Sequence, residues 1–146
     1  MNGQSPVFLA QTDTTVGFLC SDLVKLSCIK GRSINKKTIQ AVDSLTMLKK
    51  NTRAPNKFKN IIRKSQKTTF IYPDGKSFRV VFKSSPHYDF LTKFGKLYSS
   101  SANPTEKKFD KSFAIESCDI IVGNDFSEAI PSKIYRLTKN KSIRIR

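Results

Sequence analysis

The residues with the clearest chemical potential are hydrogen-bond donors and cations in short polar stretches between apolar segments. Grouped by stretch, they are Thr12 and Thr14; Lys30, Arg32 and Lys36; Thr69; Arg79; and the hydroxyl-rich run from Ser99 through Ser101 to Asn103. Such donors suit a ligand with several anionic oxygens, on which a protein acts by positioning and by stabilising charge. That chemistry requires no covalent nucleophile. Each group also has a plainer interpretation, a self-stabilised loop for the threonines and a polar turn for the serines.

Several other chemistries are excluded by what the sequence lacks. His87 is the single histidine, so a site with several histidine ligands is excluded and a Ser-His-Asp site would have to use it. No G-x-S-x-G, P-loop or G-x-G-x-x-G motif occurs. His87 follows Pro86, and we expect it at a helix start or on the surface. Cys20, Cys28 and Cys118 show no C-x-x-C pairing and are expected to be reduced thiols.

Charge is the strongest signal in the composition. The 146 residues include 27 Lys and Arg but 11 Asp and Glu, a net charge of +16. That balance favours nucleotides, nucleic acid or an anionic membrane surface as partners, although surface lysines also serve solubility alone. The 38% hydrophobic content predicts one domain, residues 1–146, with a packed core. Without a long apolar run or a signal-peptide pattern, we expect no membrane partner and a cytoplasmic location.

The elements that must position the polar groups alternate between short strands and short helices. In the first half we expect strands at residues 6–11, 14–20 and 38–42, a helix at 23–29, a helix from Asp43 or Ser44 to Lys50, and a helix after Pro55 with Phe58, Ile61 and Ile62 on one face. In the second half we expect a hairpin of residues 68–72 and 77–82, a helix at 86–94 ended by Gly95, and strands at 118–122, 133–137 and 142–146. This order predicts an α/β (α+β) fold with a mixed, twisted sheet.

The order of the polar motifs resembles that of the YrdC/YciO-like threonylcarbamoyl-AMP synthase family. Residues 11–18 are similar to the family opening P-T-(D/E)-T-x-Y-G-L, and residues 30–36 to its K-x-R-P-x-D-(N/K) loop. Residues 68–71 and 78–80 resemble its L-T and V-R-(V/I) strands. Residues 99–103 resemble its S-T-S-A-N turn and residues 131–134 its P-S-T-(I/V) element. The resemblance covers nearly the whole chain.

The resemblance implies a twisted α/β domain with a concave basic cleft. Family members join L-threonine, bicarbonate and ATP, with magnesium carried by ATP, into threonylcarbamoyl-AMP for the transferase complex that modifies tRNA. Carried over by motif, Lys30 and Arg32 would be catalytic; Thr12, Thr14, Ser99 and Ser132 would bind threonine; and Arg32, Lys36, Thr69, Ser101 and Asn103 would bind the nucleotide. The resemblance also implies that Lys30, Arg32, Lys36 and Arg79 bind double-stranded RNA, tRNA or other anions, with no metal ligand among the side chains.

The sequence departs from the family pattern at several positions. Gln11 stands where the family has proline, Val16 where it has tyrosine, and residues 65–67 (Ser-Gln-Lys) where it has P-G-P. The segment before Lys30 is short, and the N-terminal family helix is essentially missing. Three hypotheses therefore stay open: a minimal synthase, a non-catalytic RNA- or nucleotide-binding module of the same fold, and a subunit that completes its cleft with a partner protein.

Overall fold

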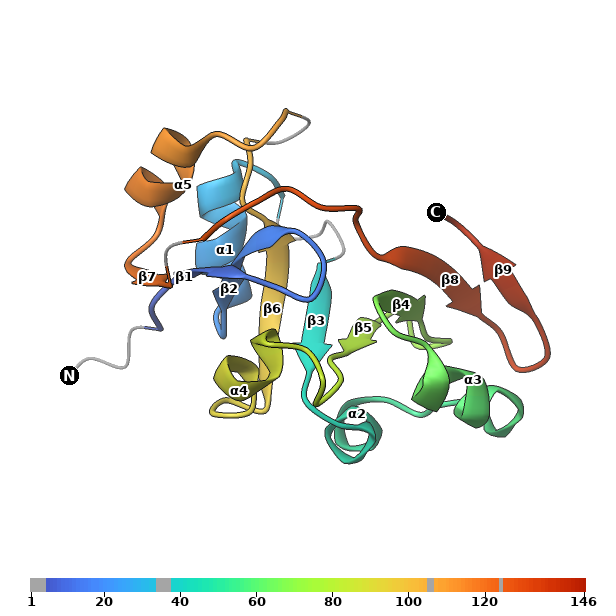
Figure 1. Cartoon of the computed structure of the whole chain (residues 1–146). Helices are drawn as coiled ribbons and strands as arrows, with labels where there is room; N and C mark the ends of the chain where they lie inside the picture. Colours follow the sequence, from blue (N-terminus) through green and yellow to red (C-terminus); the bar gives the residue numbers. More distant parts are fainter. Residues whose placement is uncertain (1–4, 34–37, 105–106, 124) are drawn as a thin grey trace.

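The computed structural model describes residues 5–33, 38–104, 107–123 and 125–146. Within these residues nine strands form one mixed sheet in the spatial order β7-β1-β2-β6-β3-β5-β4-β8-β9 (Figure 1). The strands are β1 (Phe8–Gln11), β2 (Val16–Cys20), β3 (Ile39–Val42), β4 (Thr68–Ile71), β5 (Ser77–Val80), β6 (Lys96–Ser101), β7 (Ile120–Val122), β8 (Lys133–Leu137) and β9 (Ser142–Arg144). Parallel and antiparallel pairs are both present, which confirms the predicted mixed α/β class.

Short helices fill the connections, and side chains cap the first turns of three of them, of which the cap at Ser44 was predicted. The Asp22 carboxylate accepts hydrogen bonds from the first turn of α1 (Leu23–Lys30), and the Ser44 hydroxyl does the same for α2 (Leu45–Asn51). Such caps satisfy backbone N–H groups that have no partner within the helix. The other described helices are the 3-10 turn η1 (Asn56–Phe58), α3 (Lys59–Lys64), α4 (His87–Leu91) and α5 (Lys111–Ser117).

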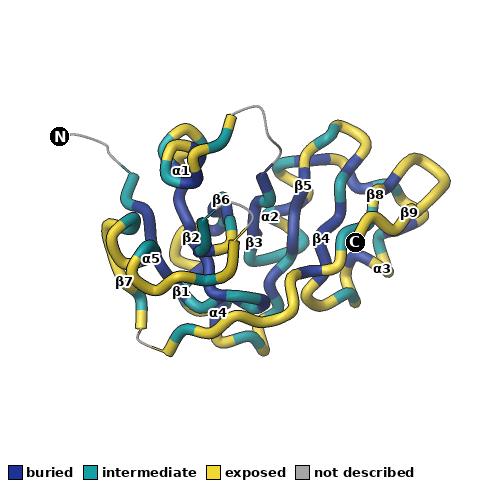
Figure 2. The backbone as a smooth tube through the Cα atoms, turned by 90° about the horizontal axis from the view of Figure 1, so that it is seen from above, coloured by how far each residue is buried: buried dark blue, intermediate teal, exposed yellow. Residues whose placement is uncertain are grey.

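The central strands are buried on both faces, so side chains of alternate residues enter different cores. Leu9 and Phe18 pack in a cluster that includes residues of α1 and α5, whereas Ala10 and Leu19 join a cluster that includes Leu91 of α4. A third cluster lies under α2, η1 and α3. Figure 2 shows the buried strands running through the middle of the molecule. Burial on both faces makes this part of the sheet a rigid support for the loops at its strand ends.

The serine run was expected in a turn, and that prediction is wrong. Ser99, Ser100 and Ser101 are the last residues of β6, and all three pair with β2. Ser99 also pairs with Ile39 of β3, so β6 is flanked on both sides. Serine has a weak intrinsic preference for strands, and pairing with two neighbours overrides it.

Two further features differ from the sequence prediction. The helix α5 was not predicted, although Asp110 caps it by accepting from the Phe113 N–H. Ile61 is 51% exposed, so it does not share the buried face of Phe58 and Ile62. The strand predicted at residues 118–122 is present as β7 and lies at the sheet edge, where Ile120 is 44% exposed.

In the described part of the chain, no helix has both the length and the apolar character needed to cross a bilayer. Cys20, Cys28 and Cys118 are free thiols.

Candidate functional site

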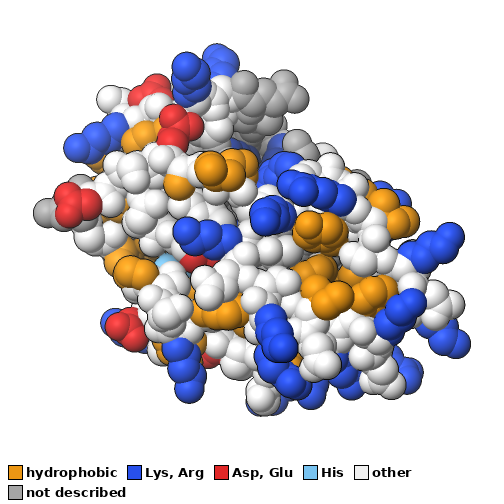
Figure 3. All heavy atoms as spheres, turned by 45° about the vertical axis from the view of Figure 1, so that its right-hand side comes forward, with side chains coloured by type: hydrophobic (Ala, Val, Ile, Leu, Met, Phe, Trp, Pro, Cys, Tyr) orange, Lys and Arg blue, Asp and Glu red, His pale blue; other side chains and the backbone are white. Residues whose placement is uncertain are grey.

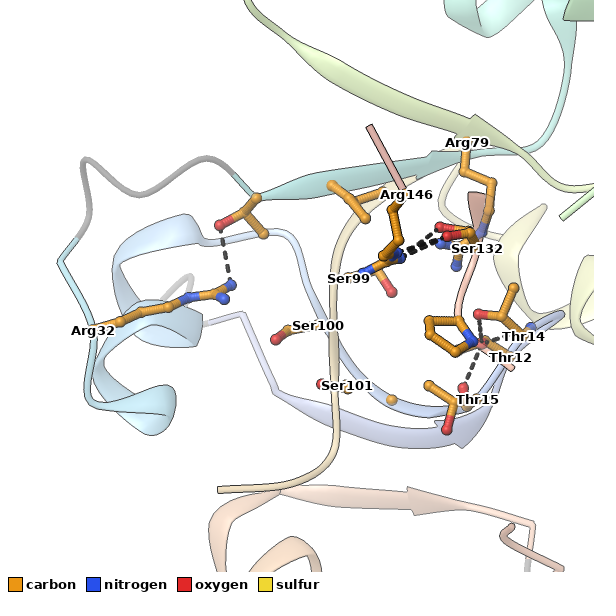
Figure 4. A pocket seen from close by; sticks show the side chains of 14 residues that line it. Thr12, Thr14, Thr15, Arg32, Arg79, Ser99, Ser100, Ser101, Ser132 and Arg146 are labelled. Atoms are coloured by element: carbon orange, nitrogen blue, oxygen red, sulfur yellow. Dashed lines mark hydrogen bonds between the residues drawn. The ribbon is translucent and has the colours of Figure 1, made fainter. Parts of the chain in front are cut away.

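A cavity of about 200 Å³ lies where β2, β6 and the segment before β8 meet (Figure 4). Its wall contains three arginines and many hydroxyl groups, and none of the described lining residues is acidic. In Figure 4, Arg32 approaches from one side of the cavity and Arg79 and Arg146 approach from the other. The lining residues are Thr12, Thr14, Thr15, Gly17, Arg32, Thr38, Ile39, Arg79, Ser99, Ser100, Ser101, Pro131, Ser132 and Arg146.

The two predicted threonines lie in the turn between β1 and β2. The Thr12 hydroxyl donates to the Thr15 carbonyl oxygen at 2.5 Å and accepts from the Thr14 N–H at 3.1 Å. The Thr12 and Thr14 hydroxyl oxygens are 3.3 Å apart. The turn is thus stabilised by its own side chains, as the plainer interpretation proposed, and it also presents both threonines to the cavity.

Arg79 of β5 makes a buried ion pair with Asp13 from the same turn. Its Nε lies 3.1 and 3.2 Å from the two carboxylate oxygens, and each side chain is 5% exposed. An ion pair taken out of water requires near-ideal geometry to offset the loss of hydration. The pair fixes the threonine turn against β5. Asp13 was not among the predicted site residues, because 66 residues separate it from its partner.

Arg146 is a second site residue that the sequence analysis missed. Its Nε and Nη2 donate to the Ser132 carbonyl oxygen at 2.9 and 2.7 Å, and Nη2 also lies 3.2 Å from the Ser132 hydroxyl oxygen. Burial lowers the pKa of Arg146, and the charge of Arg79 lowers it further. The two guanidinium groups therefore repel one another across the cavity. No local motif marks Arg146, since the β8–β9 hairpin brings it to the site.

Arg32 follows α1, which ends at Gly31 in the left-handed conformation (φ 63°). One guanidinium nitrogen, Nη2, donates to the Thr38 hydroxyl at 3.2 Å, and burial lowers the pKa of the group. The Nε atom is buried and has no hydrogen-bond partner within the described residues. A buried donor without an acceptor is costly, so this N–H can bind a ligand oxygen at little loss.

Lys30 has a different environment from the one expected of a substrate contact. Its ammonium group donates to the Ser101 carbonyl oxygen at 2.9 Å, to the Asn103 carbonyl oxygen, and to Asn103 Oδ1 at 3.1 Å. The residue is 6% exposed. Charge-assisted bonds of this kind are strong, and they tie α1 to the end of β6. The structure thus brings the basic loop and the serine–asparagine segment together.

The other predicted residues are placed as follows. Thr69 is fully buried in β4, and its hydroxyl oxygen lies 2.8 Å from that of Ser132. Asn103 lines a neighbouring cavity of about 220 Å³, which shares Thr15, Ser101, Pro131 and Arg146 with the first. Together the two cavities reach the size range of small-ligand sites, about 300–1,000 Å³. Lys36 lies outside the described residues.

Residues 125–132 cross the molecule between α5 and β8 and form part of the cavity wall (Figure 1). The Ser127 carbonyl oxygen accepts from the Val16 N–H at 3.2 Å, and its N–H donates to Gln11 Oε1 at 2.8 Å. The Ala129 N–H donates to the Thr15 hydroxyl at 3.3 Å. These bonds attach the segment to β1 and β2, and so they set where Pro131 and Ser132 lie.

His87 does not contribute to the cavity wall. It begins α4, which is one of the two positions expected for it, and at 3% exposure it does not lie on the surface. Burial lowers its pKa to about 4, and its ring stacks on Phe90. Across the described part of the chain, no group of three or more His, Cys, Asp and Glu residues is placed to hold a metal ion.

Comparison with solved structures identifies the fold. The chain matches E. coli YciO with a TM-score of 0.76 at 15% identity, covering 97% of this chain and 82% of YciO. It matches P. abyssi Sua5 complexed with L-threonine with a TM-score of 0.76 at 17% identity, covering 97% and 50%. A third match is full-length HypF in its phosphate- and nucleotide-bound form, with a TM-score of 0.73 at 16% identity, covering 97% and 26%.

The chain has the YrdC/Sua5-like fold. It spans about half of the Sua5 chain it matches and about a quarter of HypF. No family model matches the sequence, and no curated protein does so either. The YrdC/Sua5-like fold was predicted from six short motifs, and the structure places residues of five of them around the two adjoining cavities. Thr69 of the remaining motif is fully buried next to Ser132.

Proposed function

We propose that this chain is an L-threonylcarbamoyladenylate synthase, which joins L-threonine, bicarbonate and ATP and releases pyrophosphate. The observation that supports it is the convergence of Arg32, Arg79 and Arg146 with a set of hydroxyl groups around one cavity. The fold is shared with P. abyssi Sua5, whose solved structure is complexed with L-threonine. Bicarbonate, ATP and the carboxylate of threonine are anionic and repel one another in water, and a positive, partly dehydrated cavity lets them meet.

The side chains have distinct roles in this proposal. Thr12, Thr14, Ser99 and Ser132 bind the threonine hydroxyl and carboxylate. Ser101 and Asn103 serve the nucleotide. Thr69 is fully buried and lies 2.8 Å from the Ser132 hydroxyl oxygen, so it orients Ser132 on the threonine side. Arg32 binds carboxylate and phosphate oxygens in a bidentate manner. Lys30 is a positioning residue, because its ammonium group holds Ser101 and Asn103 rather than the cavity.

The reaction needs charge stabilisation more than proton transfer. The threonine amine bonds to the carbon of bicarbonate with loss of water, and an oxygen of the resulting carbamate attacks the α-phosphorus as pyrophosphate leaves. Negative charge accumulates on the phosphoryl oxygens, where the guanidinium groups stabilise it. Asp13 is bound to Arg79, so magnesium would enter with the triphosphate rather than on a protein carboxylate. The adenylate would then pass to a transferase that modifies an adenosine in tRNA.

The experiment is pyrophosphate release from ATP in the presence of bicarbonate, with and without L-threonine. We expect release that depends on threonine, and a reduction of about 100-fold in kcat for Arg32→Ala, the usual effect of removing one preorganised donor. Lys111→Ala, at the exposed start of α5, is the matched control and should keep wild-type activity. If no threonine-dependent release occurs at high enzyme concentration, the proposal is wrong.

The environment of Lys30 favours one other candidate, a nucleotide-binding module of the same fold without the synthase reaction. Its ammonium group is bound by carbonyl and amide oxygens, and residues 65–67 lack the P-G-P of the family. Calorimetry separates the two functions. A synthase binds ATP more tightly when threonine is present, because the two share one cavity, whereas a simple anion site binds ATP equally with and without it.

The predicted RNA contacts of the cleft stay predictions. Lys30 and Arg79 are 6% and 4% exposed, and each is engaged with protein oxygens. A cavity of about 200 Å³ also has no room for a duplex.

A further inference from the structure

The nine-stranded sheet has two open edges, the strands β7 and β9. Among the described residues, β7 is hydrogen-bonded to β1 on one side only, and β9 is bonded to β8 on one side only. Figure 1 shows the two strands at opposite ends of the molecule. The outer side of an edge strand presents N–H and C=O groups that can pair with a further strand.

The hydrogen bonds of each edge strand show which of its groups point outward. The Ile120 N–H donates to the Val7 carbonyl oxygen at 3.2 Å, and the Ile145 N–H donates to the Ile134 carbonyl oxygen at 2.8 Å. Neighbouring residues of a strand direct their backbone groups to opposite sides, so those of Ile121 and Arg144 point away from the sheet. Each edge therefore offers a donor and an acceptor to a new strand.

Both edges also expose isoleucine side chains. Ile120 and Ile121 are 44% and 46% exposed, and Ile143 and Ile145 are 44% and 47% exposed. Successive side chains of a strand point to opposite faces, so β7 has one isoleucine on each face, whereas Ile143 and Ile145 share a face. If β9 lay beside β7 of another copy, isoleucines would meet on that shared face and lose contact with water.

The two edges carry opposite charge. Residues 115–127, around β7, contain no Lys or Arg but three carboxylates, Glu116, Asp119 and Asp125. Residues 133–146, the β8–β9 hairpin, contain six Lys and Arg and no Asp or Glu. All nine charged residues are exposed, and one of them, Asp119, pairs with Lys25 at 2.7 Å. Figure 3 shows Lys and Arg side chains over its centre and right, with Asp and Glu gathered toward the left.

We propose that copies of this chain associate head to tail, with β9 of one copy added to the sheet beside β7 of the next. Charge selects this pairing among the three that are geometrically open. Two β9 edges repel one another, as do two β7 edges, because like charges on facing strands disfavour pairing. Pairing β9 with β7 instead brings opposite charges together. The contact is heterologous, so further copies can add to form a chain or a ring.

The net charge of +16 opposes self-association at long range, and this sets the conditions of the test. At an ionic strength of 0.15 M the Debye length is about 8 Å, so repulsion between distant charges is largely screened. The proposal does not depend on the proposed function, because neither Ile121 nor Arg144 lines the cavity of Arg32.

The test is sedimentation velocity of the full chain at this ionic strength, over a range of protein concentrations, with two variants that each block one edge. Ile121→Pro removes the outward N–H of β7, and Arg144→Pro removes that of β9. Proline is tolerated on an edge strand where its nitrogen faces away from the sheet, and circular dichroism checks that both variants are folded. We expect the wild type to form species larger than a dimer as its concentration rises. Each variant alone should stay monomeric, whereas an equimolar mixture of the two should form dimers and nothing larger.

A second arm changes charge and leaves both strands intact. In Glu116→Gln/Asp125→Asn two exposed carboxylates beside β7 are neutralised, and we expect the association constant to fall about fivefold, the effect of two exposed ion pairs. The matched control Thr46→Lys/Ser84→Lys raises the net charge by the same amount at exposed positions away from both edges. It should change the association constant by less than about twofold.

Four results would overturn the proposal. The first is a wild type that stays monomeric at every concentration. The second is self-association of Arg144→Pro alone, which would show pairing of two β7 edges, and the third is self-association of Ile121→Pro alone, which would show pairing of two β9 edges. The fourth is an equal loss in the two charge variants, which would show a general effect of net charge.

Discussion

The ion pair of Asp13 and Arg79 gives the sharpest test of how this site is built. Both side chains are 5% exposed, and the Arg79 Nε contacts the carboxylate at 3.1 and 3.2 Å. Asp13→Asn keeps the shape of the side chain but leaves a buried guanidinium near Arg146 without its counter-charge. Breaking a buried pair by removing one partner costs about 3–5 kcal/mol. We expect Asp13→Asn to lower the free energy of unfolding by about 3 kcal/mol.

Urea denaturation followed by circular dichroism measures this loss, and thermal unfolding should show a Tm lowered by roughly 6–12 °C. The matched control is Asp119→Asn. Asp119 and Lys25 are closer, at 2.7 Å, but their side chains are 46% and 33% exposed. Solvent weakens such a pair, so the control should lose less than about 1 kcal/mol despite its shorter distance.

A second variant separates the lost pair from other effects of the substitution. In Asp13→Asn/Arg79→Met the buried charge is removed together with its partner, and stability should return to within about 1–2 kcal/mol of the wild type. If Asp13→Asn costs no more than Asp119→Asn, or if the double variant is no more stable than Asp13→Asn, the reasoning from burial is refuted.

Three other substitutions test single features of the structure. A Cβ at Gly17 would lie 2.9 Å from the Ser100 carbonyl oxygen, so Gly17→Ala should push β2 away from β6. We expect the free energy of unfolding, measured by urea denaturation, to fall by about 1–3 kcal/mol. An unchanged urea midpoint would contradict the close approach. The Tyr72 hydroxyl is buried without a hydrogen-bond partner in the described structure, so Tyr72→Phe should stabilise by about 1 kcal/mol, and a clear loss would show a partner outside the described residues. The pKa of His87 is about 4 in the folded chain and 6.5 ordinarily. As the pH falls from 6.5 to 4, the unfolded state therefore binds a proton that the folded state does not bind. Stability should therefore drop by roughly 3 kcal/mol from pH 7 to 4, and His87→Phe should remove that part of the pH dependence; identical pH profiles would refute the assignment.

The predictable parts of the fold are those whose signals lie within a few residues. The caps at Asp22 and Ser44 are short-range hydrogen bonds, and the hairpin turn contains Gly75 at φ 89°. By contrast, the placement of Ser99–Ser101 in β6 depends on pairing with strands far away in sequence. The exposure of Ile61 also depends on where the sheet lies relative to α3, which helical spacing alone does not fix.

The same distinction between short-range and long-range signals applies to the candidate site. Seven residues that were predicted from motifs line the cavity: Thr12, Thr14, Arg32, Arg79, Ser99, Ser101 and Ser132. Asp13 and Arg146 were missed because their partners are 66 and 14 residues away and no pattern marks the pairing. Lys30 belongs to a predicted motif, yet its ammonium group points to the end of β6. A motif indicates which loops meet, whereas side-chain direction depends on the local packing.

The arrangement of charge in the cavity explains why it calls for a small anion. Arg32, Arg79 and Arg146 come from three distant parts of the chain and are partly dehydrated, so a small anion that replaces lost hydration binds there with high specificity. Many other Lys and Arg side chains of the described residues are exposed, and each contributes little by itself. Salt should therefore weaken anion binding at these exposed cations more than binding in the cavity, because buried charges are poorly screened.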